Sequence, residues 1–157
     1  MDWPADGLEC TVKSNVLYIN FNRAHALNAF TTKMYAAIGT AVKMAESRGD
    51  IEIIVFTGTG RAFAVGGDIS EMVESVEKRD EEALMRFLEN NPAKTIAASP
   101  LVTVALVDGL CFGGGLIVAA VCDIVLASHK AQFCLPEARI GIAEGLSVSA
   151  LLPDLGP

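Results

Sequence analysis

The chain has 157 residues with a net charge of −7 and 52% hydrophobic residues, so it can bury one core without disulfides and is too apolar to be intrinsically disordered. Its 12 Lys and Arg residues are scattered and outnumbered by 19 Asp and Glu residues, which argues against binding to the phosphate backbone of nucleic acid. The mean hydropathy of +0.42 exceeds what a free-standing domain of this size usually needs, so we expect part of the apolar surface to meet a partner.

The sequence also argues against membrane spans and metal sites. The uncharged stretch at residues 109–122 is shorter than the roughly 20 residues that a membrane helix needs. The beginning of the chain, MDWPADGLE, has no apolar segment of the kind found in secretory signals, so we expect a cytoplasmic protein. The four cysteines and two histidines show no metal-ligand spacing, and we expect no metal.

The first predicted elements are a β-hairpin and a helix. The runs at 8–13 and 16–21 read as short strands, the second rich in Val, Tyr and Ile, and the turn-prone pair Ser14-Asn15 separates them, which is typical of a hairpin. From Thr31, a plausible N-cap, apolar residues recur at helical spacing until about Gly49, which predicts an amphipathic helix.

Strands and helices alternate along the rest of the chain. The runs at 51–57 and 101–107 are almost wholly apolar, which predicts strands buried on both faces. Helical patterns fill 70–98, where Pro92 should divide the segment. A third apolar run at 124–127 predicts another buried strand. This alternation indicates an α/β domain with parallel strands, and no second domain is visible.

Two glycine-rich turns follow the buried strands. One contains Gly66-Gly67-Asp68 and the other is the triplet at 113–115, and each leads into a predicted helix. The phosphate-loop pattern GxxxxGK[ST] is absent, and so are GxGxxG and the hydrolase pattern GxSxG. Taken alone, these glycines could serve only packing and turns.

Four separated stretches carry the pattern of a known family. In order and spacing they resemble the crotonase family, the enoyl-CoA hydratase and isomerase superfamily. The resemblance implies an α/β, ClpP/crotonase-like spiral of ββα units over residues 1–157. It also implies that the C-terminal helices, which build trimers or hexamers in full-length members, are absent from this chain. The stretches are LNAF at 27–30, RAFAVGGDI at 61–69, DGLCFGGGLIVAAVCDIVLAS at 108–128 and AQFCLPEARIGI at 131–142.

The resemblance implies that an acyl-CoA thioester places its carbonyl oxygen between two backbone N–H groups. The matching positions are Gly67 and Gly114, where glycine lets the thioester approach the backbone closely. These donors would stabilise an enolate. No metal, flavin or nucleotide cofactor is expected, because coenzyme A is part of the substrate.

The resemblance also assigns proton transfer, and here the chain departs from the family pattern. Glu137 matches the glutamate of many hydratases and isomerases, whereas Ile117 stands where hydratases usually carry a second glutamate. Isomerisation needs only one carboxylate, so we expect a double-bond isomerase. A hydratase that uses a non-standard second acid, such as Glu144, and a non-catalytic acyl-CoA-binding module are the alternatives.

Further substrate contacts are implied with less specificity. The loop at 24–27 matches a family segment whose backbone contacts CoA, and Arg23 and Arg61 could meet the CoA phosphates. The stretch at 62–68 flanks the thioester. The expected substrate-binding residues are Ala24, Ala26, Leu27, Ala62, Ala64, Asp68, Ile117 and Glu144.

Overall fold

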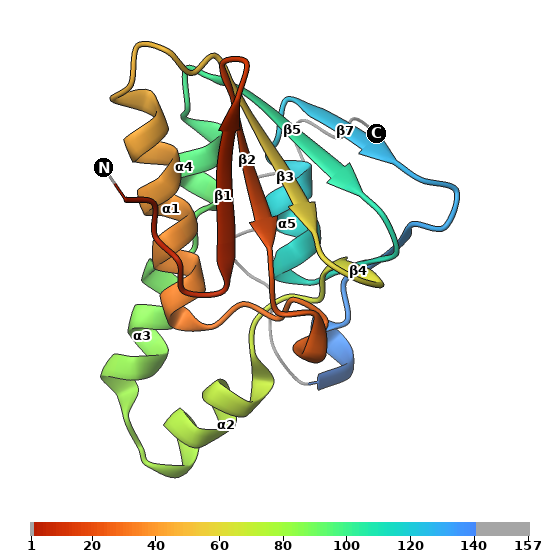
Figure 1. Ribbon diagram of the computed structural model, residues 1–157. Helices are drawn as coiled ribbons and strands as arrows, with labels where there is room; N and C mark the ends of the chain where they lie inside the picture. Colours follow the sequence, from red (N-terminus) through yellow and green to blue (C-terminus); the bar gives the residue numbers. More distant parts are fainter. Residues whose placement is uncertain (1, 141–157) are drawn as a thin grey trace.

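The structure is a computed structural model that describes residues 2–140 (Figure 1). Its first elements are strands β1 (Leu8–Lys13) and β2 (Val16–Phe21), which pair antiparallel from Leu8 opposite Phe21. Ser14 and Asn15 join them with φ values of 49° and 63°. Two successive left-handed residues give a turn whose twist matches that of the strands. The predicted hairpin is confirmed with the predicted bounds.

The main sheet has five strands in the order β1-β2-β3-β5-β7. The added strands are β3 (Ile53–Gly58), β5 (Val102–Val107) and β7 (Ile124–Ala127), and each pairs parallel to its neighbour from β2 onward. Parallel neighbours need crossover connections, which the helices supply. The predicted α/β class with parallel pairing is confirmed.

A second, smaller sheet continues the strands of the first. It contains β4 (Ala62–Ala64), β6 (Leu110–Phe112) and β8 (Gln132–Cys134), which pair parallel in that order. Each of its strands follows a strand of the main sheet after a short turn. The chain therefore repeats a strand–strand–helix unit, which confirms the predicted spiral. Runs of three residues are too short for a periodicity argument, so the sequence did not predict these strands.

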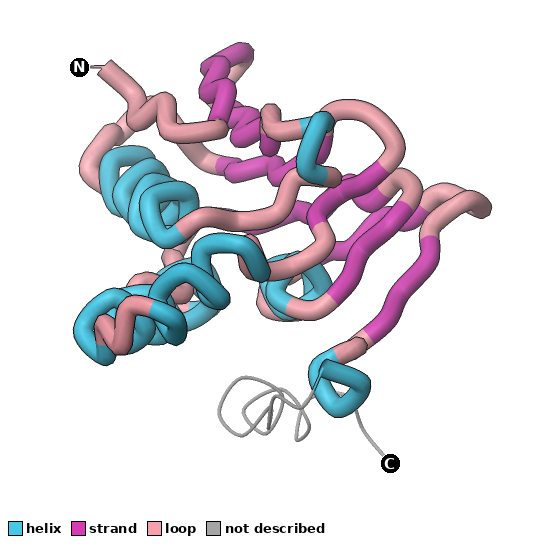
Figure 2. Tube along the Cα trace, turned by 90° about the horizontal axis from the view of Figure 1, so that it is seen from below, coloured by secondary structure: helices cyan, strands magenta, loops and turns pink. Residues whose placement is uncertain are grey.

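The helices begin with α1 (Thr32–Glu46), where the Thr31 side chain accepts a hydrogen bond from the Met34 N–H, as an N-cap should. The segment after β4 forms α2 (Ile69–Glu77), α3 (Glu81–Glu89) and α4 (Ala93–Ala97), with α4 starting directly after Pro92 as predicted. Helix α5 (Gly114–Ala120) follows β6. Helices α1, α4 and α5 lie beside the main sheet, whereas α2 and α3 project away from it (Figure 1). Figure 2 shows these helices gathered on one side of the strands.

Aromatic rings fill the core where the two sheets meet. The ring of Phe21 lies 4.9 Å from that of Phe30, 5.2 Å from that of Phe63 and 6.3 Å from that of Phe56, measured between centroids. All four residues are fully buried. They join β2, β3, β4 and the segment before α1 into one core.

The prediction that the run at 124–127 is buried was wrong. Strand β7 forms where expected, but Ile124, Val125 and Leu126 are exposed. Among the described residues, β7 is the last strand of the main sheet and has a neighbour only on its β5 side. The apolar run therefore predicted that a strand would form, but it did not predict whether other parts of the chain would bury it.

Candidate active site

The Gly66-Gly67 turn is fixed by hydrogen bonds to the segment before α1. The Phe30 N–H donates to the Gly66 carbonyl at 2.7 Å, and the Asp68 N–H donates to the Phe30 carbonyl at 2.8 Å. Gly67 is thus the middle residue of a parallel bridge to Phe30. Because the C=O and N–H of one trans peptide group point in opposite directions, and the Gly66 carbonyl accepts from Phe30, the Gly67 N–H points away from Phe30. It is directed away from the bridge that fixes it.

The two glycine-rich turns lie directly against each other. A Cβ atom added to Gly66 would lie 3.0 Å from the Gly114 backbone nitrogen, and one added to Gly114 would lie 3.4 Å from the Gly66 Cα. Gly66 and Gly113 both have positive φ, at 92° and 49°. Gly114 opens α5, so its N–H belongs to the first turn, where donors lack partners within the helix. The resemblance to the crotonase family predicted Gly67 and Gly114 as a pair, and the contact that the fold makes is between Gly114 and Gly66, the neighbour of Gly67.

Glu137 reaches the same turns from the other end of the described chain. It opens the short helix η2 (Glu137–Ile140) after β8. Its Oε1 atom lies 2.8 Å from where a Gly113 Cβ would be. Its Oε2 atom is buried and has no hydrogen-bond partner within residues 2–140. A buried carboxylate oxygen normally has a partner, so among the described residues the Glu137 Oε2 is left to meet a group from outside them.

Tyr35 is a further residue at this place, and sequence analysis missed it. It lies on α1, is 3% exposed, and its ring packs against Phe30 with centroids 5.1 Å apart. Its hydroxyl oxygen would lie 2.2 Å from a Cβ on Gly114. The available signal was a polar aromatic residue within the apolar pattern of the helix, next to Met34.

Asn28 anchors the loop that was expected to contact CoA. This residue is fully buried with φ 58°, and its amide donates to the carbonyls of Thr59, Ala62 and Phe63 at 3.0, 2.8 and 3.2 Å. Its Oδ1 accepts from the Arg23 N–H at 2.9 Å. Asn28 lies within the LNAF stretch, but nothing in the sequence alone indicates its role.

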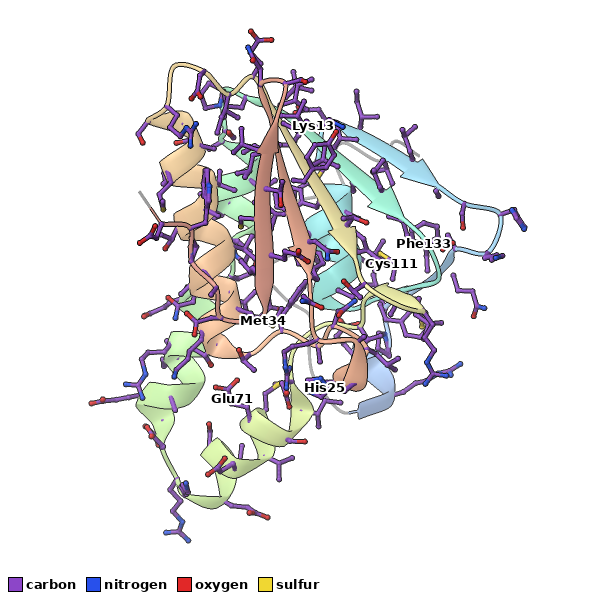
Figure 3. The ribbon with its side chains drawn as sticks, in the orientation of Figure 1. Lys13, His25, Met34, Glu71, Cys111 and Phe133 are labelled. Carbon is purple, nitrogen blue, oxygen red and sulfur yellow. The ribbon has the colours of Figure 1, made fainter. Side chains whose placement is uncertain are left out.

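The anchored loop is the 3₁₀ helix η1 (Ala24–Ala26), ended by Leu27 in the left-handed region. Ala24 is exposed next to Gly60, and Ala26 and Leu27 are half-buried. Figure 3 labels His25 on η1 and Glu71 on α2 at the same end of the main sheet. The Glu71 carboxylate accepts from the Thr32 N–H at 2.8 Å, which ties α2 to the start of α1.

The Asp68 carboxylate is used within the fold. One of its oxygens caps α2 by accepting from the Ser70 and Glu71 N–H groups, and the other pairs with Arg23 at 2.9 Å. Arg23 also donates to the Ala29 carbonyl at 2.6 Å. Both side chains therefore brace the site, and Arg61, which is exposed, is the more accessible cation of the two that were considered for CoA phosphates.

The remaining predicted substrate contacts differ in access. Ala62, Ala64 and Ile117 are 1%, 0% and 3% exposed. The two alanines belong to β4 and are buried together with their backbone. Ile117 lies one turn after Gly114 on α5. Glu144 lies outside the described residues.

The chain matches the model of one protein family over most of its length. The model described as enoyl-CoA hydratase/isomerase matches residues 11–155. The chain belongs to the enoyl-CoA hydratase/isomerase family. Membership in the crotonase superfamily, which the four motifs predicted, is confirmed.

Curated relatives in this family carry hydratase names. The chain is 38% identical over 127 residues to the mitochondrial enoyl-CoA hydratase of Pongo abelii, covering 81% of this chain and 42% of the relative. It is 31% identical over 133 residues to the 2,3-dehydroadipyl-CoA hydratase of Escherichia coli, covering 85% and 51%. The chain thus spans about half the length of the curated relatives that it matches.

Solved structures of the enoyl-CoA hydratase/isomerase family agree with the fold. A Geobacillus kaustophilus structure, titled as an enoyl-CoA hydratase subunit, matches with a TM-score of 0.83 and 32% identity, covering 96% of this chain and 58% of that one. An enoyl-CoA hydratase from Mycobacterium avium matches with a TM-score of 0.82 and 30% identity, covering 94% and 57%. The crotonase-like fold is therefore confirmed.

Within residues 2–140, no helix is long and apolar enough to cross a membrane. In the same range, no three His, Cys, Asp or Glu side chains are grouped as a metal site would require.

Proposed function

We propose that this chain acts on an acyl-CoA thioester through an enolate that is held by the N–H groups of Gly67 and Gly114. The proposal is supported by the contact between the two glycine turns, since a carbonyl oxygen can accept from both donors only if they converge. A preorganised donor to a developing oxyanion lowers a barrier by about 2.7–4 kcal/mol. The Gly67 segment is held by its bridge to Phe30, which suits a preorganised donor.

Glu137 is the proposed proton carrier. Its buried and unpartnered Oε2, next to Gly113, is the single observation that carries the proposal. The carboxylate takes a proton from C2 of a 3-enoyl-CoA, and the electron pair moves onto the thioester oxygen to give a dienolate. The protonated carboxyl then returns the proton at C4, which leaves the 2-enoyl-CoA. Atoms and charge balance with this one residue.

Ile117 favours isomerisation over hydration. Its side chain is buried and apolar one turn after Gly114, so it cannot bind or activate a water molecule. Hydration would need a second acid, and the double-bond shift does not. The proposed activity is therefore a double-bond isomerase with a single glutamate.

The test compares two substrates and one variant. The protein is incubated with a 3-enoyl-CoA and, separately, with a 2-enoyl-CoA, and products are identified by mass spectrometry. We expect the 2-enoyl-CoA product from the first and almost no 3-hydroxyacyl-CoA from the second. Glu137→Gln, which keeps the side-chain volume, should remove the isomerase activity. Hydration at a rate comparable to isomerisation would overturn the isomerase assignment.

A hydratase is the second candidate, because relatives such as that of Pongo abelii carry this name. Glu144 would then supply the missing acid, and Glu144→Gln should lower hydration without removing acyl-CoA binding. A non-catalytic binding module is the third candidate, favoured by Ile117. Calorimetry with a nonreactive acyl-CoA separates it, because tight binding without turnover on any substrate would indicate a module.

A further inference from the structure

We propose that Tyr35 is a positioning residue, whose hydroxyl group occupies the space of the absent Gly114 side chain and thereby sets where the Gly114 N–H lies. This inference rests on the proposed function, because Gly114 is one of the two proposed donors to the enolate oxygen. Tyr35 acts through the backbone of this donor and not on the reacting atoms of the substrate.

The Tyr35 hydroxyl lies against the Gly114 backbone. A Cβ atom added to Gly114 would lie 2.2 Å from the hydroxyl oxygen and 3.4 Å from Cζ of the same ring. Since a carbon–carbon bond is about 1.5 Å long, the hydroxyl oxygen is at most about 3.7 Å from the Gly114 Cα. The hydroxyl therefore fills the position in which any other residue would carry its first side-chain atom.

The backbone of Gly114 does not itself require a glycine. Gly113 has a positive φ, whereas Gly114 does not, so alanine can adopt the conformation at position 114. Apart from Tyr35, the nearest described atom to the added Cβ is the Gly66 Cα at 3.4 Å, which is an ordinary van der Waals separation. Among the described residues, the hydroxyl of Tyr35 is thus the group that excludes a side chain from this donor.

The ring of Tyr35 is tied to the other proposed donor through Phe30. It is 3% exposed and packs against the Phe30 ring with centroids 5.1 Å apart. The Phe30 backbone makes both hydrogen bonds of the bridge that holds Gly67. Close-packed side chains transmit displacements to their neighbours. One buried side chain therefore contacts the anchor of one donor and the backbone of the other, and the separation of the two N–H groups depends on it.

The experiment is a double-mutant cycle on the full chain with 3-hexenoyl-CoA as substrate. Tyr35→Phe removes only the hydroxyl and should lower kcat about tenfold with KM changed less than about twofold, because an oxyanion donor acts mainly in the transition state. Gly114→Ala should lower kcat about 100-fold, since its methyl displaces the donor. In the double variant the methyl takes the place of the hydroxyl, so kcat should be at least about tenfold above that of Gly114→Ala.

Tyr18→Phe is the matched control. Tyr18 lies on β2 and is 38% exposed, so loss of its hydroxyl should change kcat by less than about twofold. Adding Tyr18→Phe to Gly114→Ala should restore no activity. Two independent sites would instead give a Tyr35→Phe/Gly114→Ala variant with the product of the two single losses.

A second readout does not need turnover. The carbonyl stretching frequency of bound hexanoyl-CoA, a saturated thioester, is measured by infrared difference spectroscopy. Hydrogen bonds from both donors should lower this frequency, and the lowering should shrink in each single variant and return in the double variant. If Gly114→Ala does not fold, the double variant is compared with Tyr35→Phe and should equal or exceed it in kcat and in the carbonyl shift.

A double variant with kcat no higher than that of folded Gly114→Ala, or a Tyr35→Phe effect confined to KM, would overturn the inference. With Gly114→Ala unfolded, a double variant below Tyr35→Phe in both readouts would overturn it as well. If the unmodified chain turns over no 3-enoyl-CoA, the proposed activity fails, while the carbonyl shifts still test the position of the donor. Absence of any carbonyl shift in the unmodified chain would overturn both.

Discussion

The carboxylate of Glu137 lies against the backbone of Gly113, close enough that a methyl group on Gly113 would stand 2.8 Å from Oε1. Separations under about 3 Å are not found between a Cβ and another heavy atom, so the glycine and the glutamate constrain each other. Gly113 also has φ 49° and ψ −125°, a backbone conformation that strains any residue with a Cβ. The position of the proposed proton carrier therefore depends on the absence of a side chain 24 positions away in the sequence.

Gly113→Ala should lower both activity and stability, because the added methyl displaces the Glu137 carboxylate and the backbone conformation at this position strains an alanine. The added methyl pushes the carboxylate out of place, and a misplacement of about 1 Å can reduce a catalysed rate about 100-fold. The measurement is kcat for 3-hexenoyl-CoA, with circular dichroism as the check on folding. Gly39→Ala is the matched control, because its Cβ meets nothing within 4 Å. Activity within a factor of about three of the unmodified chain would show that Glu137 tolerates the displacement.

Asn28→Ala should destabilise the fold through lost hydrogen bonds. Three carbonyl groups and one N–H that now bond to Asn28 would lose their partner, and a buried unsatisfied group costs about 1–3 kcal/mol. We expect a loss of about 3 kcal/mol in the free energy of unfolding, measured with urea. Asn22→Ala, at an exposed position nearby, is the control and should change it by less than about 0.5 kcal/mol. Equal effects for the two variants would contradict the anchoring role of Asn28.

Gly115→Ala should be among the most damaging single-methyl changes in the chain. The new Cβ would stand 2.3 Å from the Ala64 carbonyl oxygen, which belongs to β4 and cannot rotate away. Overpacking of a rigid site costs about 1–3 kcal/mol or more. Gly39→Ala, which adds the same methyl to an open helix position, should instead stabilise by about 0.5–1 kcal/mol. Thermal unfolding of the two variants gives the comparison, and a stabilised Gly115→Ala would refute the close packing of α5 on β4.

Stability should fall at acidic pH through Asp123. This carboxylate accepts from the N–H and the hydroxyl of Thr103, both at 2.7 Å, and these hydrogen bonds lower its pKa. A lowered pKa contributes stability above the unfolded value of about 3.9, and the contribution disappears as pH falls through the folded pKa. The midpoint temperature of thermal unfolding should therefore decrease as the pH is lowered below about 4. In Asp123→Asn the decrease in stability below about pH 4 that is due to Asp123 should vanish. A pH profile of stability unchanged by this substitution would show that Asp123 does not contribute to it.

The sequence predicted the longer helices and strands better than it predicted their burial or the short strands that depend on long-range pairing. The hairpin and α1 carry local signals, such as the Ser14-Asn15 turn and the Thr31 cap. The hairpin formed with the expected bounds, and α1 began after Thr31 as expected but ended at Glu46, before Gly49. The burial of β7 depends on what covers it, which an apolar run does not specify. Strands of three residues, such as β4, arise from pairing with distant strands and leave no periodic pattern.

The candidate site was predictable only through the motifs. Residue types and the family pattern selected Gly67, Gly114 and Glu137, and the fold brings their segments together. Asn28 and Tyr35 were missed, because their importance lies in contacts with Ala62 and Gly114, which are remote in sequence. Long-range contacts of this kind cannot be inferred from one sequence without an alignment.

The spiral of repeated units also sets the order in which parts of the molecule should unfold locally. Apart from the β1–β2 hairpin, each strand of the two sheets pairs only with strands of the preceding or the following unit, so opening one unit removes contacts from its neighbours in turn, as in a linear array. Within residues 2–140, strand β3 is paired on both sides and largely buried, whereas β7 is paired on one side and exposed. Amide protons of β7 should therefore exchange with solvent long before those of β3, and local unfolding should advance from the β7–β8 unit toward the hairpin.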